Sequence, residues 1–473
     1  MMKNKDKEDK EFSTKTAVAY SFANFADITA SQFFSFLLFT FYFVIVGLNV
    51  NWITLAFIIW SIWNAINDPI LGTLSDKTST KIGKRKPWIL LGVGPMCIIL
   101  FLLWTPPAGE LAAFIYMMIM ILLFDLFYTM FSLNQVSLFP EMYPNVNQRA
   151  RANNIIQVVG IVALIFAFIT PSFFIPDYNN PQYQVNYAVA GLFMAIVTAV
   201  SAFIFIKYGL KERKEYSKDS EIAPSFIESL KTSAKNKSFR RYVIANFAVF
   251  YMFGMLPMMS PLYGRFVLQI EDSTILSLLL GLTFISAGGC MIIWNKVTIK
   301  FGVRIGHILA MLSLIITLIP FMFISTFMGA IFAYALTGLG LAGALFFRAV
   351  TISAIIDEDE LKTGVRREGG YMGINALVIR LATIGIILTI NLVFNSVGWK
   401  VFVPEDITEN TIFGLRALMC IFPSIFLGIG ILSMLGFPIT KERYFEIKEK
   451  IDKLHEQKKQ NMLKEENLTT KSK

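Results

Sequence analysis

Polar side chains at helical spacing interrupt the apolar run at 52–74. Asn64 and Asp68 are four residues apart, so they share one face of a helix, and Asn67 lies beside them. Pro69 has no backbone N–H and would leave a carbonyl free one turn earlier. Carboxylate, amide and carbonyl oxygens are ligands of hard cations, and a desolvated carboxyl can instead carry a proton. We therefore favour a cation site here over a polar contact between helices.

Other ionisable residues also stand inside apolar runs, where a charge costs about 2.5–3.5 kcal/mol on insertion and so suggests function. They are Asp27, Asp125, Arg348 and Arg380. Arg380 could bind an anionic group of a solute, donate to sugar hydroxyls, or pair with Asp27 or Asp68. Its guanidinium stays charged, so we do not expect it to carry a transported proton. Asp125 lies one turn before Thr129 and could support the site or face another helix, and no role is predicted for Arg348.

The composition indicates the class of protein in which these residues stand. The chain has 473 residues, of which 55% are hydrophobic and 16% charged, and its mean hydropathy is +0.58. Soluble proteins carry about 25% charged residues, so an ordinary soluble enzyme is excluded, as are disordered and fibrous chains. A spanning helix needs about 20 apolar residues. Twelve runs qualify and predict an all-α polytopic membrane protein: 18–47, 52–74, 87–105, 111–138, 153–175, 187–208, 242–268, 273–295, 304–325, 328–356, 371–397 and 411–438.

The basic residues are distributed with a strong bias. If twelve helices alternate in direction, 38 of the 43 Lys and Arg residues lie on one side of the membrane. Basic loops mark the cytoplasmic side, so both termini of this multi-pass cell-membrane protein are expected in the cytoplasm. The same placement disfavours nucleic-acid binding, which needs basic residues clustered on a soluble face. The three scattered cysteines and two distant histidines predict neither a disulfide nor a metal site.

The chain divides into two halves of six helices. We predict halves at 1–208 and 242–439, a cytoplasmic linker at 209–241, and a charged cytoplasmic tail at 440–473 with a helix near 440–459. A short basic turn follows the second helix of each half, and Gly83 and Gly302 within these turns suit a tight backbone. Two parallel repeats of this kind predict the major facilitator fold.

Charged clusters stand at the predicted cytoplasmic ends of helices 2, 4 and 10. The first could be a latch in which Asp76 faces the basic turn, or an ordinary basic loop. After helix 10, four acids precede three bases within eleven residues, which is either a solvated loop or a charge lock that breaks when the halves rock. The residues assigned to gating are Asp76, Arg85, Glu141, Asp357, Glu360, Arg366 and Arg367.

Several of these motifs resemble the glycoside–pentoside–hexuronide:cation symporters of the major facilitator superfamily. The resemblance is carried by WNAINDPILG at 63–72, GKRKPW at 83–88, LFPEM at 138–142 and the charged segment 357–368. It extends over essentially all the helices. It implies a twelve-helix carrier that works by alternating access and couples solute uptake to Na⁺ or H⁺.

The resemblance also implies roles for individual residues. The cation site would comprise Asp68, Asn67 and Thr129, with Asn64 in place of the first helix-2 carboxylate of the family. The missing charge leaves H⁺ coupling, weaker Na⁺ coupling or facilitated diffusion open. A helix-4 acid that grips galactosides is replaced as well, so the pocket fits a sugar, a glycoside or an acidic sugar contacting the helix-11 arginine. The residues expected to line it are Asp27, Tyr128, Ser132, Gln157, Asn375 and Arg380.

The predicted function is therefore secondary active transport of a sugar, glycoside or hexuronate, coupled to H⁺ or Na⁺. We expect a lipid-embedded monomer with no cofactor besides the coupling ion. A carrier of lysolipids or other amphiphiles, or an uncoupled facilitator, is the alternative, and a non-transporting membrane sensor is the third hypothesis. An ATP-driven pump or an enzyme is disfavoured because the sequence has no Gly-x-x-x-x-Gly-Lys-Ser/Thr loop and no evident catalytic set.

Overall fold

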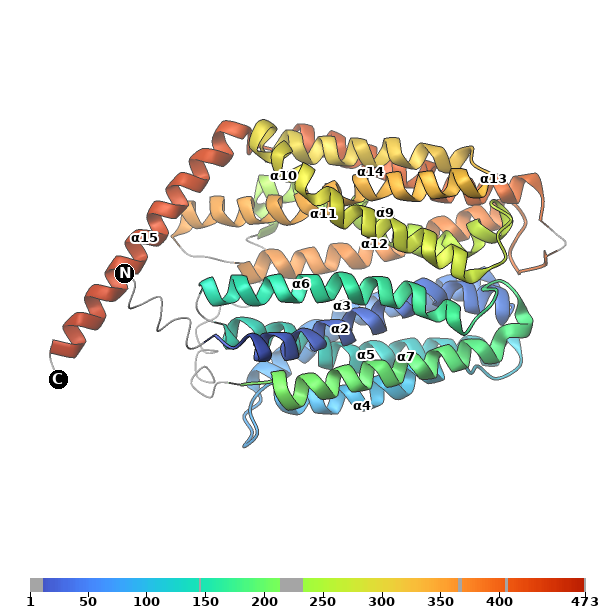
Figure 1. The fold of residues 1–473 in the computed structure, drawn as a ribbon, viewed down its shortest axis with the longest axis horizontal. Coiled ribbons are helices and arrows are strands. Elements are labelled where there is room, and N and C mark those ends of the chain that lie inside the picture. The colour runs from blue at the N-terminus through green and yellow to red at the C-terminus, as the bar shows by residue number, and fades with distance from the viewer. Residues whose placement is uncertain (1–11, 144–145, 213–232, 365–367, 405–406, 472–473) are drawn as a thin grey trace.

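The computed structural model of the chain describes residues 12–143, 146–212, 233–364, 368–404 and 407–471. Long helices run side by side along the length of the molecule (Figure 1). Both termini lie at one end of the bundle, where α15 (Lys441–Lys471) projects away from the other helices.

Ten helices of the described chain are long and apolar enough to cross a membrane. One of them, α10, comprises two spans because Gly302 interrupts it, and α4 is apolar but only 17 residues long. These make twelve spans, and the all-α prediction is confirmed. They are α2 with η1 (Thr14–Ile45), α3 (Val50–Lys77), α4 (Lys86–Leu102), α5 (Glu110–Met142), α6 (Val146–Ile169), α7 (Gln184–Ile204), α9 (Lys237–Phe266), both parts of α10 (Ser273–Leu318), α11 (Phe327–Thr363), α12 (Glu368–Ser396), and α13 (Glu409–Met419) with α14 (Ile421–Leu435).

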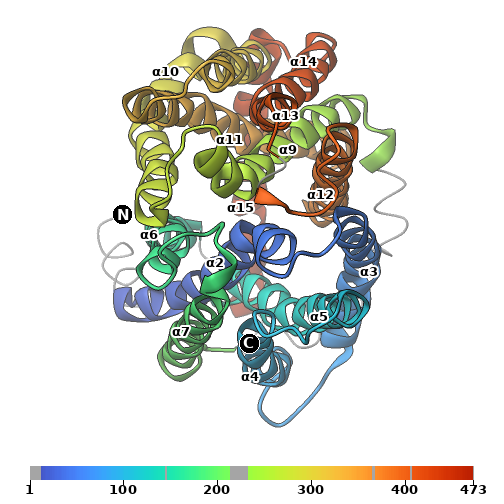
Figure 2. The same ribbon diagram turned by 90° about the vertical axis from the view of Figure 1, so that its right-hand side faces the viewer.

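The spans form two groups of helices, which Figure 2 shows end on. In the first group, α2 packs against α6 and α7, and α4 packs against α5. In the second, α9 packs against α12 and α14, and α10 packs against α11. The groups meet where α3 contacts α12, α2 contacts α9 and α6 contacts α10. Most of the segment between the groups lies outside the described residues, so the linker boundaries at 209 and 241 stay a prediction.

The repeated basic turn occurs in both groups and depends on glycine. Gly83 has φ 121° and Gly302 has φ 74°, which are backbone conformations that L-residues rarely adopt. A Cβ on Gly302 would also lie 2.7 Å from Lys441 Cα, where the tail helix begins. The tight turns inferred from the sequence are therefore confirmed at both positions.

Polar contacts join the two groups at the end opposite the termini. The segment between α6 and α7 reaches across to the second group. The Asn179 side chain donates to the Pro261 carbonyl at 2.9 Å, and the Tyr178 and Ser277 hydroxyls are 2.8 Å apart. On the other side of the bundle, Val50 N–H donates to the Lys400 carbonyl at 2.8 Å. This end of the molecule is therefore held closed between the groups.

A buried acid and an arginine also meet at the closed end. Arg265 Nε lies 3.8 Å from Asp177 Oδ2, and the guanidinium also contacts Glu271. Burial raises the pKa of the Asp177 carboxyl above its ordinary range, while the Asn179 N–H and Arg265 act in the opposite direction. Because the pKa is raised in this conformation, Asp177 binds its proton more tightly here than in a conformation that exposes it to water, so protonation favours the closed end.

Acidification is therefore expected to hold this end of the bundle closed. Spin labels at the exposed positions Val185 and Phe327 report the distance between the groups. As the pH falls, the distance distribution should shift to shorter values, with a change in population ratio of about fivefold, which corresponds to about 1 kcal/mol. Asp177→Asn, which resembles the neutral acid, should give the shorter distances at every pH. An equal pH response in the wild type and Asp177→Asn would contradict the assignment.

The tail helix α15 is longer than the helix expected near 440–459. Its first turns pack against α11 and α10, and Ile447 and Ile451 on its inner face are buried. Burial of two isoleucines gives this charged segment an apolar attachment to the second group of helices.

Candidate functional site

A cavity of about 930 Å³ lies between the two groups of helices. Its walls come from α2, α3 and α5 on one side and from α11 and α12 on the other. Toward the termini it reaches Val136 and Ser137, close to the end of α5 at Met142. The volume suits a small solute, and the lining combines aromatic rings with a few charged side chains, as ligand pockets commonly do.

Asp68 on α3 is the point where the two groups make their central contact. Thr129 Oγ1 on α5 donates to Asp68 Oδ1 at 3.0 Å, and Arg380 on α12 forms an ion pair with Asp68 Oδ2. Arg380 also donates from Nε to the Asn64 side chain and from Nη1 to the Ala376 carbonyl at 2.7 Å. The structure thus brings Asp68, Asn64, Thr129 and Arg380 together, and of the pairings considered for Arg380 it is the one with Asp68 that forms.

Asp125 is the second acid of this site, and from the sequence it could either support the site or face another helix. It is buried on α5 and accepts hydrogen bonds from the side chains of Asn64 and Asn67, the latter at 3.2 Å. Asn67 therefore faces Asp125 and not Asp68. The sequence signal for a role of Asp125 was its position one turn before Thr129. Two side chains at this spacing share one face of a helix, and here that face of α5 lies toward α3. Asn64 consequently lies between two carboxylates and contacts Arg380 as well.

Some of the residues predicted to bind the solute line the cavity, and others do not. Asp27, Tyr128 and Ser132 line the cavity, and within the described chain Asp27 Oδ1 is buried without a hydrogen-bond partner. Gln157 is exposed on α6 and is not part of the lining. Asn375 lies on α12 but accepts a hydrogen bond from Asn246 at 2.5 Å, again away from the lining. Helix rotation explains both departures, because neighbouring residues of one helix face different directions.

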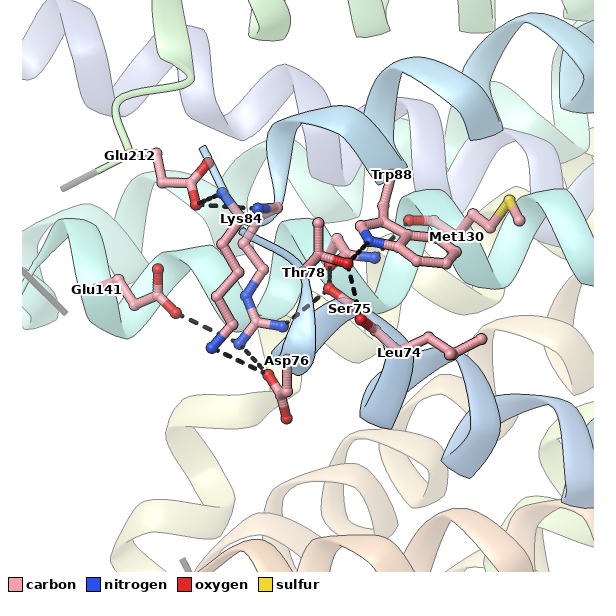
Figure 3. A network of polar contacts seen from close by, with 11 residues as sticks. Leu74, Ser75, Asp76, Thr78, Lys84, Trp88, Met130, Glu141 and Glu212 are labelled. Carbon is pink, nitrogen blue, oxygen red and sulfur yellow. Dashed lines mark hydrogen bonds and ion pairs between the residues drawn. The ribbon is translucent and has the colours of Figure 1, made fainter. Parts of the chain in front are cut away.

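The cluster after helix 2 has the contacts expected of a latch (Figure 3). Asp76 lies 3.3 Å from Lys84 Nζ and 2.9 Å from Arg85 Nη2, and Arg85 is 3.4 Å from Glu141 Oε1. Glu212, which the sequence did not single out, accepts hydrogen bonds from three backbone N–H groups at the start of α4, at Lys84, Arg85 (2.9 Å) and Lys86 (3.2 Å). A carboxylate at a helix N-terminus is favourable because it meets unpaired N–H groups and the positive end of the dipole.

The acidic run at the end of α11 is engaged by neighbouring elements. Glu360 Oε2 lies 3.1 Å from His455 on α15, and Asp357 lines a small cavity between α11 and α15. Glu358 accepts a hydrogen bond from Ser238 at 3.0 Å and pairs with Lys362 at 3.1 Å. This is not a solvated loop but a set of contacts with α9 and the tail. The basic partners predicted at Arg366 and Arg367 lie outside the described residues.

Comparison with known proteins assigns the chain to a protein family. The family model described as MFS/sugar transport protein matches residues 19–441. The chain belongs to this family of the major facilitator superfamily. The resemblance to glycoside–pentoside–hexuronide:cation symporters is thereby confirmed, and the chain is a multi-pass membrane transporter, not an enzyme.

Individual relatives are distant but cover much of the chain. An uncharacterized symporter of Synechocystis sp. is 22% identical over 94% of this chain and 97% of its own length. An isoprimeverose transporter of Lactiplantibacillus pentosus is 24% identical over 74% of each chain. The crystal structure of the nucleoside transporter NupG superimposes with a TM-score of 0.66 at 14% identity, covering 89% of this chain and all of the other. At that identity the superposition supports the fold alone.

The latch after helix 2 can be tested through Arg85, which is nearly buried and touches two acids. Arg85→Gln leaves Asp76 and Glu141 without their shared counter-charge, so one access state should lose about 1 kcal/mol, a fivefold change in population. We expect slower solute exchange in proteoliposomes with solute affinity nearly unchanged. Lys84→Gln, which removes a pairing with Asp76 alone, is the milder control. Equal exchange rates for wild type and Arg85→Gln would argue against a latch.

Proposed function

We propose that the protein is a secondary active symporter that moves a sugar, glycoside or hexuronate by alternating access, coupled to H⁺ or Na⁺. The observation that carries the proposal is the shared contact at Asp68, which one group of helices holds through Thr129 and the other through Arg380, beside a cavity between them. The Lactiplantibacillus relative is an isoprimeverose transporter, which supports a carbohydrate as the solute.

Coupling follows from competition for Asp68. The Arg380 guanidinium contacts both Asp68 and Asn64, so it takes the place that a bound cation would hold. A cation or proton that binds Asp68 displaces Arg380, which then becomes available to a solute in the same cavity. Binding can drive rocking only when the ligands have different affinities for the two access states. The exchange of partners at Asp68 supplies that difference.

We infer the direction of opening from the distribution of charge. The distribution of basic loops supports a cytoplasmic location for both termini. The polar contacts at Asn179 and Arg265 then close the outer end, and the cavity extends toward the cytoplasm along α5. The described conformation is on this basis inward-facing. A single chain suffices, because both groups of helices and the cavity between them belong to one monomer.

Asp68→Asn tests the coupling. The variant keeps a polar side chain but loses the charge that attracts a cation, so accumulation driven by a Na⁺ or H⁺ gradient should fall at least about tenfold, while solute exchange without a gradient persists. Uptake into proteoliposomes with imposed gradients measures both. Asp272→Asn is the matched control, because Asp272 caps α10 at an exposed position and Asn caps a helix equally well. Undiminished gradient-driven accumulation in Asp68→Asn would overturn the assignment.

Charge relocation tests the part played by Asp125. The Asn64 side chain donates to Asp125, so the two positions share one contact. Asp125→Asn should weaken coupling at least about tenfold, and Asn64→Asp combined with Asp125→Asn should restore it to within about threefold, since the total charge returns. Coupling ratios in proteoliposomes provide the readout. A double variant as impaired as Asp125→Asn would show that the position of Asp125, not only its charge, matters.

An uncoupled facilitator is the second candidate, and one observation favours it: Arg380 already neutralises Asp68 without a cation. An uptake panel of sugars, uronates and lysolipids, each with and without Na⁺ and H⁺ gradients, separates the candidates. Carbohydrate uptake that follows a gradient supports symport, and carbohydrate uptake that ignores both gradients identifies a facilitator. Uptake of lysolipid alone would identify an amphiphile carrier, and specific binding with no exchange of any solute would identify a sensor.

A further inference from the structure

Two arginines line the cavity, and their surroundings differ. Arg380 has a carboxylate, an amide oxygen and a carbonyl as partners. Arg348, on α11, lines the same cavity, and in the part of the chain that the structure describes it has no acidic partner. Its Nε is buried without a hydrogen-bond acceptor, and its guanidinium lies over the Phe250 ring at 4.8 Å from the centroid. Arg348 is thus held by an aromatic face, with hydrogen-bonding capacity left over.

A buried guanidinium without a counter-charge is costly. It cannot lose its proton at physiological pH, so it cannot become neutral as a buried lysine does. A cation–π contact offsets only part of the lost hydration. None of the three acids in the described cavity wall is paired with Arg348. Asp68 pairs with Arg380, Asp125 accepts hydrogen bonds from two amides, and Asp27 lies on α2 with one oxygen unpartnered. A compensating anion for Arg348 therefore has to arrive from outside the chain.

On the opposite wall of the cavity, a hydrogen-bond acceptor lacks a donor. Asp27 on α2 lines the cavity with Tyr128 and Ser132, and its Oδ1 is buried without a donor among the described residues. A carboxylate with a free oxygen accepts hydrogen bonds from hydroxyl groups. The cavity thus presents an acceptor for hydroxyls on the α2 wall and a cation on the α11 wall.

We propose that Arg348 is an oxyanion-binding site and that the preferred solute is a polyhydroxylated acid, with a carboxylate or sulfonate at Arg348 and hydroxyls at Asp27. This inference rests on the proposed carbohydrate transport and names its substrate class. The planar fork of a guanidinium matches the two oxygens of such an anion, and Phe250 beneath it fixes the plane in which they bind. Symport of one such monoanion with one monovalent cation would move no net charge.

The test uses purified full-length protein in proteoliposomes and three solutes that differ at one carbon: methyl β-glucoside, methyl β-glucuronide and the corresponding 6-sulfonate. The wild type should take up the acidic solutes with a half-saturation concentration about 10- to 100-fold lower than the neutral glucoside, the worth of a charge-assisted bidentate contact. Arg348→Gln should abolish this preference, so that the acidic solutes and the neutral glucoside reach half-saturation at similar concentrations. Arg348→Lys should keep part of it, and Arg240→Gln, at an exposed position on α9, should keep all of it.

The outcomes separate this inference from the proposed function. The two acidic solutes distinguish carboxylate from sulfonate as the bound oxyanion. Uptake of neutral glucoside without any preference for the acids, or an unchanged preference in Arg348→Gln, overturns the role of Arg348 and leaves carbohydrate transport standing. Failure of all three solutes, together with the sugars and uronates of the wider panel, overturns the proposed carbohydrate transport and this inference with it. A monodisperse size-exclusion peak and an unchanged circular-dichroism spectrum of purified Arg348→Gln show that the variant is folded.

Discussion

The contact on which this structure depends is the ion pair between Asp68 and Arg380. Each charge alone is expensive inside a membrane, so each needs a partner, and the partners lie on different groups of helices. The requirement for charge pairing therefore fixes how α3 and α12 face each other across the cavity. The same contact makes the pair a point of control, because a ligand that pairs with either member weakens the link between the groups.

The rest of the interface is asymmetric along the bundle. At the end opposite the termini, many small contacts join the groups, among them Asn179 with Pro261 and Arg265 with Asp177. None of these is strong alone, since partly exposed ion pairs and single hydrogen bonds each contribute about 1 kcal/mol. A change of access requires that this set be exchanged for contacts at the other end, where Arg85 and Glu360 already hold clusters within their own groups. Contacts at the two ends therefore favour opposite access states, with the Asp68–Arg380 pair lying between them.

The sequence predicts the fold well because a backbone in lipid must satisfy its own hydrogen bonds, which makes long apolar runs into helices. The turn glycines and the Asp76–Arg85 pair also follow from local spacing and charge, whereas the Asp68–Thr129 contact was expected from the family resemblance. Residues whose role depends on helix rotation could not be placed so securely. Asn67 turns toward Asp125, Gln157 is exposed and Asn375 bonds to Asn246, because a shift of about 100° per residue decides which wall a side chain meets. Glu212 was not identified because its partners are backbone N–H groups distant in sequence.

The two cavity arginines suggest how solute and cation would be linked in the proposed symporter. Arg380 has partners within the protein and Arg348 has a buried Nε without an acceptor, so an arriving anion would meet Arg348 first and bring negative charge onto the α11–α12 wall. That added charge would stabilise Arg380 at a distance from Asp68. Asp68 would then lack a counter-charge, and it would bind a cation more tightly with the solute present than without it. By reciprocity the cation would strengthen solute binding to the same degree. Coupling of this kind would follow from the high free energy of unpaired charges inside a membrane.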